Sequence, residues 1–465
     1  MFHENRKSIN NFAATDVAPK FKAYHLGNFR SIPQIKHLTE EQLFDIEVVG
    51  NVLPFKVNTY VVNELINWNN VPADPIFILT FPQKDMLEPH NFDKMAKALK
   101  SGASREEIKR IANEIRQDLN PHPAGQMDYN VPIMNNIKLD GMQHKYNETV
   151  LFFPKQGQTC HAYCTFCFRW PQFTGTGEQF AAKDIQTVID YVESHTEVTD
   201  ILFTGGDPMI MSGKVFADYI NAIIAANIPN LKTIRIGTKS LAYWPYRFTT
   251  DPDSKLILRA FENIILSGKQ VAIMAHFNHP NEMKTAAVRD AIRKIRETGA
   301  QIRTQSPIFR ALNDSSEVWS EMWTEQVRLG CIPYYMFMAR DTGAQEYFKI
   351  SLVDAWNIFR NAYNNVSGLG RTVRGPVMSC GPGKVQMLGV SEINGEKVMV
   401  LRFIQGRNND WVHRPFFAKY DENAYWIDDL KPAFGEEKFF FEDELEQIYA
   451  DKKTAIEACE IEILA

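Results

Sequence analysis

Three closely spaced cysteines are the strongest chemical signal in the sequence. Cys160, Cys164 and Cys167 lie within eight residues. Thiolates at this spacing fit on one loop around one metal centre, and they are the usual ligands of iron–sulfur clusters and of structural zinc. Zinc would need a fourth ligand, but His161 is too close to Cys160 to serve easily, and no second Cys/His pair follows at finger-like spacing. Three cysteines without a fourth suit a four-iron cluster with one open iron; a zinc knuckle or buried thiols are the alternatives.

The elements that must position these cysteines begin near residue 149, where short apolar runs alternate with longer helical patterns. Six β-then-α units at this spacing predict an α/β fold with a parallel sheet, either open or closed into a barrel. The cysteines follow the first strand, at the strand end where ligands bind in such folds. The predicted strands are 149–154, 199–204, 233–238, 270–277, 301–306 and 332–339. The predicted helices lie near 180–195, 214–227, 254–267, 283–299, 316–329 and 352–365.

The region before this core, residues 1–145, is predicted to be mostly helical. Thr39 and Gln42 have the spacing of a capping box, and Ser104 and Glu107 repeat it. The isoleucines that follow Ser104 then recur at helical intervals. We therefore expect an N-terminal helical region in front of a core over residues 146–390.

The region after the core, residues 391–465, is predicted to be a small β appendage and an acidic tail. Two strand-like runs, 385–393 and 398–404, flank Asn394-Gly395, which is typical of a type I′ hairpin. Residues 421–465 hold 14 acids against 4 lysines, a balance of −10, so the rest of the chain carries +5 of the net −5. The tail also holds several phenylalanines, which predicts that it packs on the body with a solvated acidic face.

Composition excludes several classes of protein. The chain has 465 residues, of which 45% are hydrophobic and 23% charged, which excludes disorder and collagen-like structure. It has no apolar run of about 18 residues and no visible secretory signal, so we expect no membrane span. The mild positive excess does not suggest a nucleic-acid surface. Three of the six cysteines are clustered and three are scattered, whereas a disulfide framework needs many cysteines in a short secreted chain. The cluster therefore favours a metal centre in a reducing compartment, and hence the cytoplasm.

The Cys-x3-Cys-x2-Cys spacing resembles that of the radical S-adenosylmethionine (SAM) enzymes. The resemblance includes an aromatic residue before the third cysteine, Phe166, and a Gly-Gly-acid turn after the next strand, Gly205-Gly206-Asp207. It implies that the three cysteines hold a four-iron cluster, that Phe166 stacks on the adenine of SAM, and that the turn helps to hold the methionine amino group. Glycines there allow close backbone approach, and the carbonyls and carboxylate would meet an ammonium.

More narrowly, residues 55–390 resemble the lysine 2,3-aminomutase family. The segments that carry the resemblance include 144–146, 204–207, 235–238, 276–282, 304–306, 313–314, 333–335 and 367–368. Such enzymes resemble a partial (βα)6 barrel and use SAM, a four-iron cluster and pyridoxal 5′-phosphate (PLP). The resemblance implies that Gln305 contributes to SAM binding and that Lys384, in a Gly-Pro-Gly-Lys stretch, holds PLP. Thr149 replaces a family arginine just before the first strand, so Arg247 is a candidate anchor for the PLP phosphate; the alternative is that Arg247 is a structural residue.

The same resemblance suggests the class of substrate. Arg169, two residues after Cys167, matches an arginine that pairs with the substrate α-carboxylate, as a guanidinium can do bidentately. Arg340 stands where lysine-specific members place an aspartate, which favours a distal carboxylate and an acidic amino acid such as glutamate or aspartate. The alternative is that the adjacent Asp341 takes over and lysine remains the substrate. This alternative is less favourable because a one-residue shift in a strand moves the side chain to the opposite face.

The resemblance therefore implies a radical SAM isomerase that moves an amino group from the α- to the β-carbon of an amino acid. The expected partners are a small amino acid substrate, a flavodoxin- or ferredoxin-type electron donor and a second copy of the chain. One alternative keeps the radical SAM core without PLP and acts on another small molecule or a protein. Another alternative is a non-enzymatic zinc or iron–sulfur module.

Overall fold

The computed structural model describes residues 19–175, 180–182 and 184–464. Within these residues the core is a mixed sheet of eleven strands, seven of them parallel neighbours that follow one another in chain order. All six predicted strands are confirmed; the seventh, β12, was not predicted. The parallel strands are β6 (Thr149–Phe152), β7 (Asp200–Phe203), β8 (Thr233–Thr238), β9 (Gln270–His276), β10 (Gln301–Ile308), β11 (Ile332–Met338) and β12 (Arg374–Ser379).

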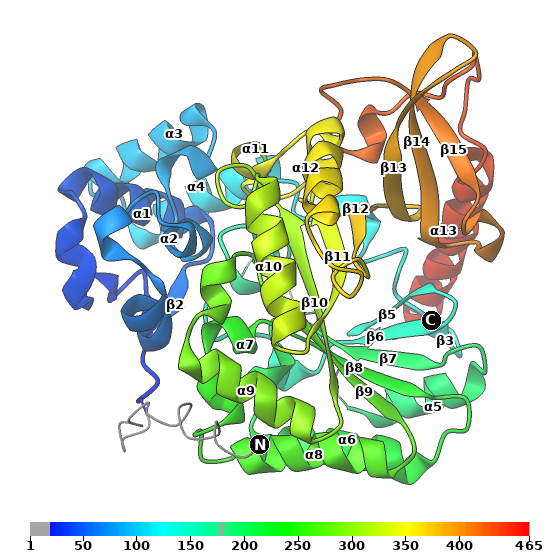
Figure 1. Cartoon of the computed structure of the whole chain (residues 1–465), viewed down its shortest axis with the longest axis horizontal. Coiled ribbons are helices and arrows are strands. Elements are labelled where there is room, and N and C mark those ends of the chain that lie inside the picture. The colour runs from blue at the N-terminus through cyan, green and yellow to red at the C-terminus, as the bar shows by residue number, and fades with distance from the viewer. Residues whose placement is uncertain (1–18, 176–179, 183, 465) are drawn as a thin grey trace, which may run out of the picture.

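The six predicted helices are also confirmed, and they pack on the outside of the curved sheet (Figure 1). Each buries one apolar stripe: in α9, for example, Val288, Ala291, Ile292 and Ile295 recur at helical intervals and are buried. The six helices are α5 (Gln186–Ser194), α6 (Gly213–Ala226), α8 (Ser254–Leu266), α9 (Ala286–Glu297), α10 (Ser316–Arg328) and α12 (Leu352–Asn364). Two shorter helices, α7 (Ser240–Tyr243) and α11 (Gln345–Phe348), follow β8 and β11.

Antiparallel strands extend both sides of the parallel array. β5 (Met142–Tyr146) pairs with β6, while β13 (Gly383–Ile393), β14 (Glu396–Gly406) and β15 (Pro415–Lys419) continue from β12. The predicted hairpin is confirmed as β13–β14, with positive φ at Asn394 (52°) and Gly395 (82°), as a type I′ turn needs. The hairpin is not a separate appendage, however, because β13 runs through residue 390 as a strand of the main sheet.

The sheet curls until its two sides meet. The side-chain amide of Gln405, in β14, donates to the carboxylate of Glu148, between β5 and β6. Arg407 donates from Nη2 to Oδ1 of Asn130 at 2.6 Å. These contacts close the curl and give the α/β core the partial-barrel form expected from the sequence.

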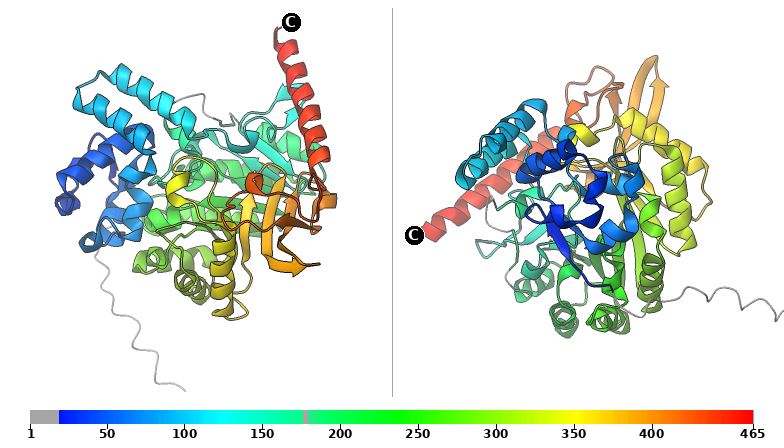
Figure 2. Two further views of the ribbon diagram at one scale, coloured as in Figure 1. Left: turned by 90° about the horizontal axis from the view of Figure 1, so that it is seen from above. Right: turned by 90° about the vertical axis from the view of Figure 1, so that its left-hand side faces the viewer.

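The N-terminal region packs on one side of the core and is mostly helical (Figure 2). It contains α1 (Glu40–Val52), α2 (Pro75–Thr80), α3 (Pro89–Lys100) and α4 (Arg105–Asp118), with a small sheet of β1 (Ala23–His25) and β2 (Lys56–Asn58). The capping box of Thr39 and Gln42 is present with both hydrogen bonds. Ser104 caps α4 by accepting from the Glu107 amide. A further two-stranded sheet, β3 (Ile133–Met134) with β4 (Ile137–Lys138), precedes β5.

The acidic tail ends in helix α13 (Glu442–Leu464), on the side of the core away from the N-terminal region (Figure 2). Phe439 and Phe441 are buried against Phe416, at ring-centroid distances of 5.3 and 5.6 Å. The predicted packing of the tail on the body is therefore confirmed. Across the described ranges, no helix combines the length and apolar character needed to span a membrane.

Candidate active site

The cysteine loop follows β6, at the carboxyl end of the parallel strands. Its backbone is fixed from two sides. The Asp207 amide donates to the Thr159 carbonyl at 2.8 Å. From strand β2 of the N-terminal region, Lys56 donates from Nζ to the Cys160 carbonyl at 2.6 Å. The position of the loop is therefore set by the core and the N-terminal region together.

The three thiols are half-buried, and none of them forms a disulfide. Burial raises the pKa of the Cys164 thiol to about 11 although Lys239 opposes the shift, and burial together with Cys164 raises the pKa of Cys167 to about 12 although Arg169 opposes it. The thiols therefore hold their protons until a metal displaces them. Within the described part of the chain, no three His, Cys, Asp or Glu side chains are arranged to hold one metal ion.

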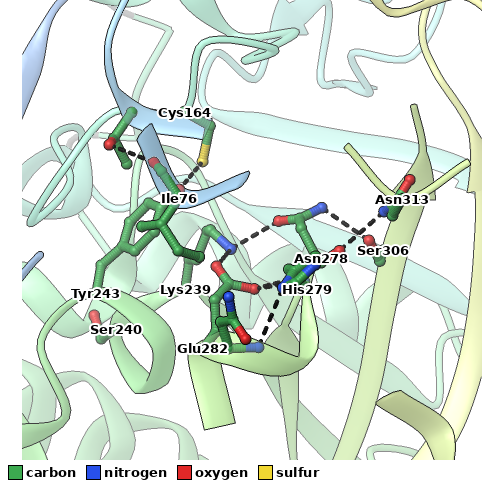
Figure 3. Close-up of polar contacts among 12 residues, drawn as sticks. Ile76, Cys164, Lys239, Ser240, Tyr243, Asn278, His279, Glu282, Ser306 and Asn313 are labelled. Atoms are coloured by element: carbon green, nitrogen blue, oxygen red, sulfur yellow. Dashed lines mark hydrogen bonds and ion pairs between the residues drawn. The ribbon is translucent and has the colours of Figure 1, made fainter. Parts of the chain in front are cut away.

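Tyr243, at the end of α7, contacts one of these sulfurs. The Cys164 thiol donates to Oη of Tyr243 at 3.6 Å (Figure 3). Burial raises the pKa of Tyr243 well above its ordinary value, so the phenol keeps its hydrogen. The sequence pattern gave no signal for this contact, because Tyr243 lies 79 residues from Cys164.

The Gly205-Gly206-Asp207 turn packs directly under the cysteine loop. Gly205 has φ of +130°, and a Cβ atom on Gly206 would lie 2.5 Å from the Thr159 carbonyl oxygen. A side chain at position 206 would therefore collide with backbone, and the glycine is required before any ligand is considered. The structure places the predicted turn beside the predicted cluster loop.

The Asp207 carboxylate is fully engaged within the protein. It accepts from the hydroxyls of Thr238 at 2.7 Å and Ser240 at 3.0 Å. It also accepts from the backbone amides of Met209 and Lys239, both at 2.9 Å. The carboxylate thus ties the ends of β7 and β8 together, and the backbone of the turn is the part that remains to meet a ligand.

A buried ion pair lies next to this turn. Lys239 donates from Nζ to Glu282 at 2.6 Å and to Oδ1 of Asn278 at 2.7 Å (Figure 3). Glu282 is fully buried and also accepts from the backbone amides of Asn278 and His279. The sequence run 276–282, which the family resemblance singled out, therefore builds a polar network at the ends of β8 and β9.

Phe166 and Gln305 line the same end of the sheet. The Phe166 ring contacts Phe309 at a centroid distance of 4.3 Å, which makes an apolar wall. Gln305 lies 2.8 Å from Nε2 of His276, whose pKa burial and nearby Lys239 lower to about 3. The imidazole is therefore neutral and accepts the Gln305 amide hydrogen on Nε2.

Lys384 is the second residue of β13, and its side chain extends to aromatic rings of β5 and β11. Its Nζ donates to Oε1 of Gln405 at 2.6 Å and lies 5.0 and 5.2 Å from the ring centroids of Tyr146 and Tyr335. Two aromatic rings and one hydrogen-bond partner thus lie directly around the amine.

Burial lowers the pKa of Lys384 to about 7, helped by the positive charges of Arg235 and Arg374. A large fraction of the amine is therefore neutral near pH 7 and can attack a carbonyl. Arg235 is itself paired with Asp200, while the guanidinium of Arg374 lies 4.4 Å from the Tyr335 ring centroid. The lysine chemistry and the nearby cations fit a group that carries an aldehyde and a phosphate.

Arg169 and Arg340 lie close to each other, with Arg169 near Cys167 and Arg340 near Tyr146 and Cys380. Both guanidinium groups lie over the Phe168 ring, at 5.0 and 5.5 Å from its centroid. Burial lowers the pKa of Arg169 to about 10, although Cys167 opposes the shift and Arg340 adds to it. The structure therefore brings the two predicted substrate arginines together.

Arg340 and Asp341 do not lie on opposite faces of a strand, contrary to the prediction from the sequence. β11 ends at Met338, so Arg340 and Asp341 lie beyond the strand and do not alternate between its faces. The Nε atom of Arg340 lies 3.7 Å from Oδ1 of Asp341. Both atoms are buried, and within the described residues neither makes a hydrogen bond. The two side chains therefore face the same interior space.

The structure does not favour Arg247 as a phosphate anchor. Its Nε and Nη2 atoms donate to the carbonyls of Met209 at 2.7 Å and Met211 at 2.6 Å, and Nη1 is paired with Asp253. Two guanidinium nitrogens thus brace the loop after β7, and the third holds the residue that precedes α8. Arg247 lies in the 3-10 helix Pro245–Phe248 and is itself buried.

Lys145 was not predicted as a site residue, although it lies in segment 144–146, which carries part of the family resemblance. It donates from Nζ to the Cys380 carbonyl, and burial together with the charges of Arg407, Arg340 and Lys384 lowers its pKa well below the ordinary value. Its neighbour Tyr146 was not predicted either. Both residues were missed because nothing in the sequence shows that β5 and β13 meet. Only the closure of the sheet reveals them.

Comparisons with known proteins agree with this geometry. The chain is 30% identical over 406 residues, 87% of its length and 95% of the relative's, to an Aquifex aeolicus protein named "Putative L-lysine 2,3-aminomutase". It is 28% identical to the L-lysine 2,3-aminomutases of Haemophilus influenzae and Clostridium subterminale, covering 48% and 49% of this chain and 62% and 51% of theirs. No family model matches.

Among solved structures, Streptococcus suis SuiB bound to S-adenosylmethionine is 12% identical, with a TM-score of 0.34 and 60% of each chain covered. A radical SAM methyltransferase from Sphaerobacter thermophilus is 15% identical, with a TM-score of 0.35, covering 51% of this chain and 68% of that one.

The sequence relatives define the class as radical SAM isomerases. Within that class, the chain belongs to the lysine 2,3-aminomutase family. Enzymes of this family use a four-iron cluster, SAM and PLP. The thiols, the glycine turn and the amine of Lys384 described above are donor groups that fit these three cofactors.

Proposed function

We propose that this enzyme is a PLP-dependent radical SAM 2,3-aminomutase that acts on an acidic amino acid. The observation that carries the proposal is the buried guanidinium of Arg340. It lies beside Arg169 and within electrostatic reach of Lys145, whose charge also interacts with that of Lys384. Two cations in one interior space can bind the two carboxylates of glutamate or aspartate.

Cys160, Cys164 and Cys167 would hold the four-iron cluster, and the open iron would hold SAM. The backbone of Gly205 and Gly206, the Phe166 ring and Gln305 would complete the SAM site, with the Asp207 carboxylate keeping the turn in place. Lys384 would hold PLP. When bound, the cluster with SAM supplies a hydrogen-abstracting radical, and PLP supplies an extended π system for the amino nitrogen.

The chain's own residues bind and orient the cofactor and the substrate. Lys384 presents a neutral amine, which Gln405 holds by a 2.6 Å hydrogen bond. Lys145 and Arg374 are the cations best placed to face a phosphate, taking the role once expected of Arg247. Arg169 would grip the α-carboxylate, so that the β-carbon faces the cysteine loop while the aromatic walls exclude water.

Arg340 would bind the distal carboxylate. Its Nε hydrogen makes no hydrogen bond among the described residues, and a buried donor of this kind favours an acceptor. Asp341 partly balances its charge at 3.7 Å. A lysine substrate would instead place an ammonium between Asp341 and the guanidinium of Arg340, which repels it.

The proposal also keeps a one-electron donor of the flavodoxin or ferredoxin type as partner. It keeps a helical region over 1–145 in front of a radical SAM core that begins at 146, and it extends that core past residue 390 because β13 continues through it.

The test begins with the cofactor. The cluster is reconstituted without oxygen, PLP is added, borohydride is applied, and the labelled peptide is mapped by mass spectrometry. A pyridoxyl group on Lys384 supports the proposal. Glutamate, aspartate and lysine are then incubated with SAM and a reductant, and the β-amino acid products are resolved by chromatography. If Lys384 stays unmodified while the cluster cleaves SAM, the aminomutase proposal is wrong and a PLP-free radical enzyme remains.

A further inference from the structure

Three contacts, two of the backbone and one of the ring, hold Tyr243 at the cysteine loop. Its backbone amide donates to the Lys239 carbonyl at 2.9 Å, and its carbonyl accepts from Nδ2 of Asn58 at 2.9 Å. The ammonium of Lys239 lies 4.4 Å from the centroid of its ring. The side chain is 1% exposed, so its hydroxyl cannot turn to bulk water.

Within the described residues, the hydroxyl of Tyr243 is hydrogen-bonded to the sulfur of Cys164, with Oη 3.6 Å from Sγ (Figure 3). In the metal-free protein the thiol donates its hydrogen to Oη. A cysteine that ligates iron has lost that hydrogen and can only accept. The direction of the hydrogen bond must then reverse, and the phenol becomes the donor to the sulfur.

Hydrogen bonds to cysteinyl sulfurs, together with net charge and solvent exposure, set the reduction potentials of iron–sulfur clusters. Reduction adds one electron and increases the negative charge on the sulfurs, which an O–H dipole stabilises. The electron comes from an external one-electron donor. No bond to the tyrosine forms or breaks, and the phenol keeps its hydrogen.

We propose that Tyr243 tunes the cluster by donating a hydrogen bond to the Cys164 sulfur, which makes the cluster easier to reduce. This inference rests on the proposed role of Cys160, Cys164 and Cys167 as cluster ligands. It makes Tyr243 a positioning residue rather than a catalytic one. It also gives the short helix α7 a function, since the helix carries the phenol to the sulfur.

The test is a redox titration of the reconstituted cluster without SAM, PLP or amino acid, followed by the electron paramagnetic resonance signal of the reduced state. Tyr243→Phe removes only the hydroxyl. At a fixed poised potential, its ratio of reduced to oxidised cluster should fall about tenfold, which for one electron is about 59 mV.

Tyr60→Phe is the matched control. Tyr60 is also 1% exposed, but its hydroxyl is paired with Thr285 at 2.7 Å rather than with a sulfur. Its ratio should equal that of the unaltered enzyme. An unchanged ratio in fully loaded Tyr243→Phe, or an equal fall in both variants, overturns the inference.

A second measurement applies where Tyr243→Phe does not keep a full cluster. The unaltered protein is reconstituted in H2O and in D2O, and the iron–sulfur stretching bands are compared by resonance Raman spectroscopy. The same comparison on the clusters that Tyr243→Phe does retain separates the phenol from backbone donors such as the Arg169 amide at Cys167. A smaller shift in that variant supports the hydrogen bond, and an equal shift overturns it. An unaltered chain that assembles no four-iron cluster overturns the proposed function as well, whereas a loaded cluster without these effects overturns only the role of Tyr243.

Discussion

The amine of Lys384 and the side-chain amide of Gln405 face each other across β13 and β14, with Nζ 2.6 Å from Oε1. Gln405 in turn donates to the carboxylate of Glu148, which lies between β5 and β6. The lysine is thus oriented by a residue that is itself held by the opposite side of the sheet. The amine is fixed in position while burial keeps a large fraction of it uncharged near neutral pH.

This arrangement predicts the pH dependence of PLP capture. The lowered pKa of Lys384, about 7, means that its neutral, nucleophilic fraction rises as pH increases through 7 and is nearly complete above pH 8. The rate of pyridoxyl incorporation at Lys384, measured by borohydride quenching and peptide mapping, should therefore level off near pH 8. An ordinary lysine titrates near about 10.4, so label on exposed lysines should keep increasing toward pH 10. A rate at Lys384 that climbs in parallel with theirs contradicts the structure.

Arg340 and Asp341 make opposite predictions for substrate choice. If Arg340 binds a distal carboxylate, Arg340→Gln should reduce kcat/KM for the acidic amino acid by about 10- to 100-fold, the range expected for a lost hydrogen bond between charged groups. Asp341→Asn should leave that value the same or raise it, because a repelling carboxylate is removed. Steady-state kinetics with glutamate, aspartate and lysine give the answer. If Asp341→Asn abolishes turnover and Arg340→Gln improves turnover of lysine, the acidic substrate is ruled out.

The buried pair of Lys239 and Glu282 should be costly to break. Glu282 is fully buried, so Glu282→Gln leaves the Lys239 ammonium without its counter-charge and should lower the free energy of unfolding by about 3–5 kcal/mol. Urea unfolding of the metal-free protein measures this. Glu321→Gln is the matched control, since its pair with Lys284 at 3.2 Å is more than half exposed and should cost no more than about 1 kcal/mol. Similar losses in both variants would mean that the buried pair has no special role.

Gly206→Ala should disturb the cysteine loop in the absence of any ligand. The added methyl would meet the Thr159 carbonyl at 2.5 Å, and overpacking of this kind costs about 1–3 kcal/mol. We expect lower stability in the metal-free state and less iron bound after reconstitution. Gly368→Ala is the control, because a Cβ atom at Gly368 meets nothing within 4 Å. Normal stability with a selective loss of SAM binding would assign Gly206 to the ligand alone.

The core could be predicted from the sequence because its signals are local. Each parallel strand from β6 to β11 is an apolar run followed by an amphipathic helix, and the Asn394-Gly395 turn identifies the hairpin. β12 was missed because Gly375 and Pro376 lie inside it, and both residues weaken a strand signal. The hairpin was wrongly set apart from the core, since a local pattern does not show which edge of a sheet a strand joins.

The candidate site was predictable only where motifs carry it. The cysteines, the glycine turn and Lys384 stand in short recognisable segments. The engaged state of Arg247 depends on the carbonyls of Met209 and Met211, which no sequence pattern shows. Likewise, Arg340 and Asp341 were assigned to opposite faces of a strand that ends two residues earlier. Long-range closure places Lys145 and Gln405 beside Lys384, so single-sequence reasoning could not find them.

The link between Gln405 and Glu148 also has a consequence for how the molecule is made. The two residues are 257 positions apart, so this contact has very high sequence separation and can form only after the intervening strands have assembled. The cysteine loop needs far less of the chain, since the residues that fix it, Lys56, Asp207 and Tyr243, are all synthesised early. A nascent chain therefore completes the surroundings of its thiols well before it can bury Lys384. Until β14 docks, that amine lacks its Gln405 partner, so its reactivity reports the closure of the sheet.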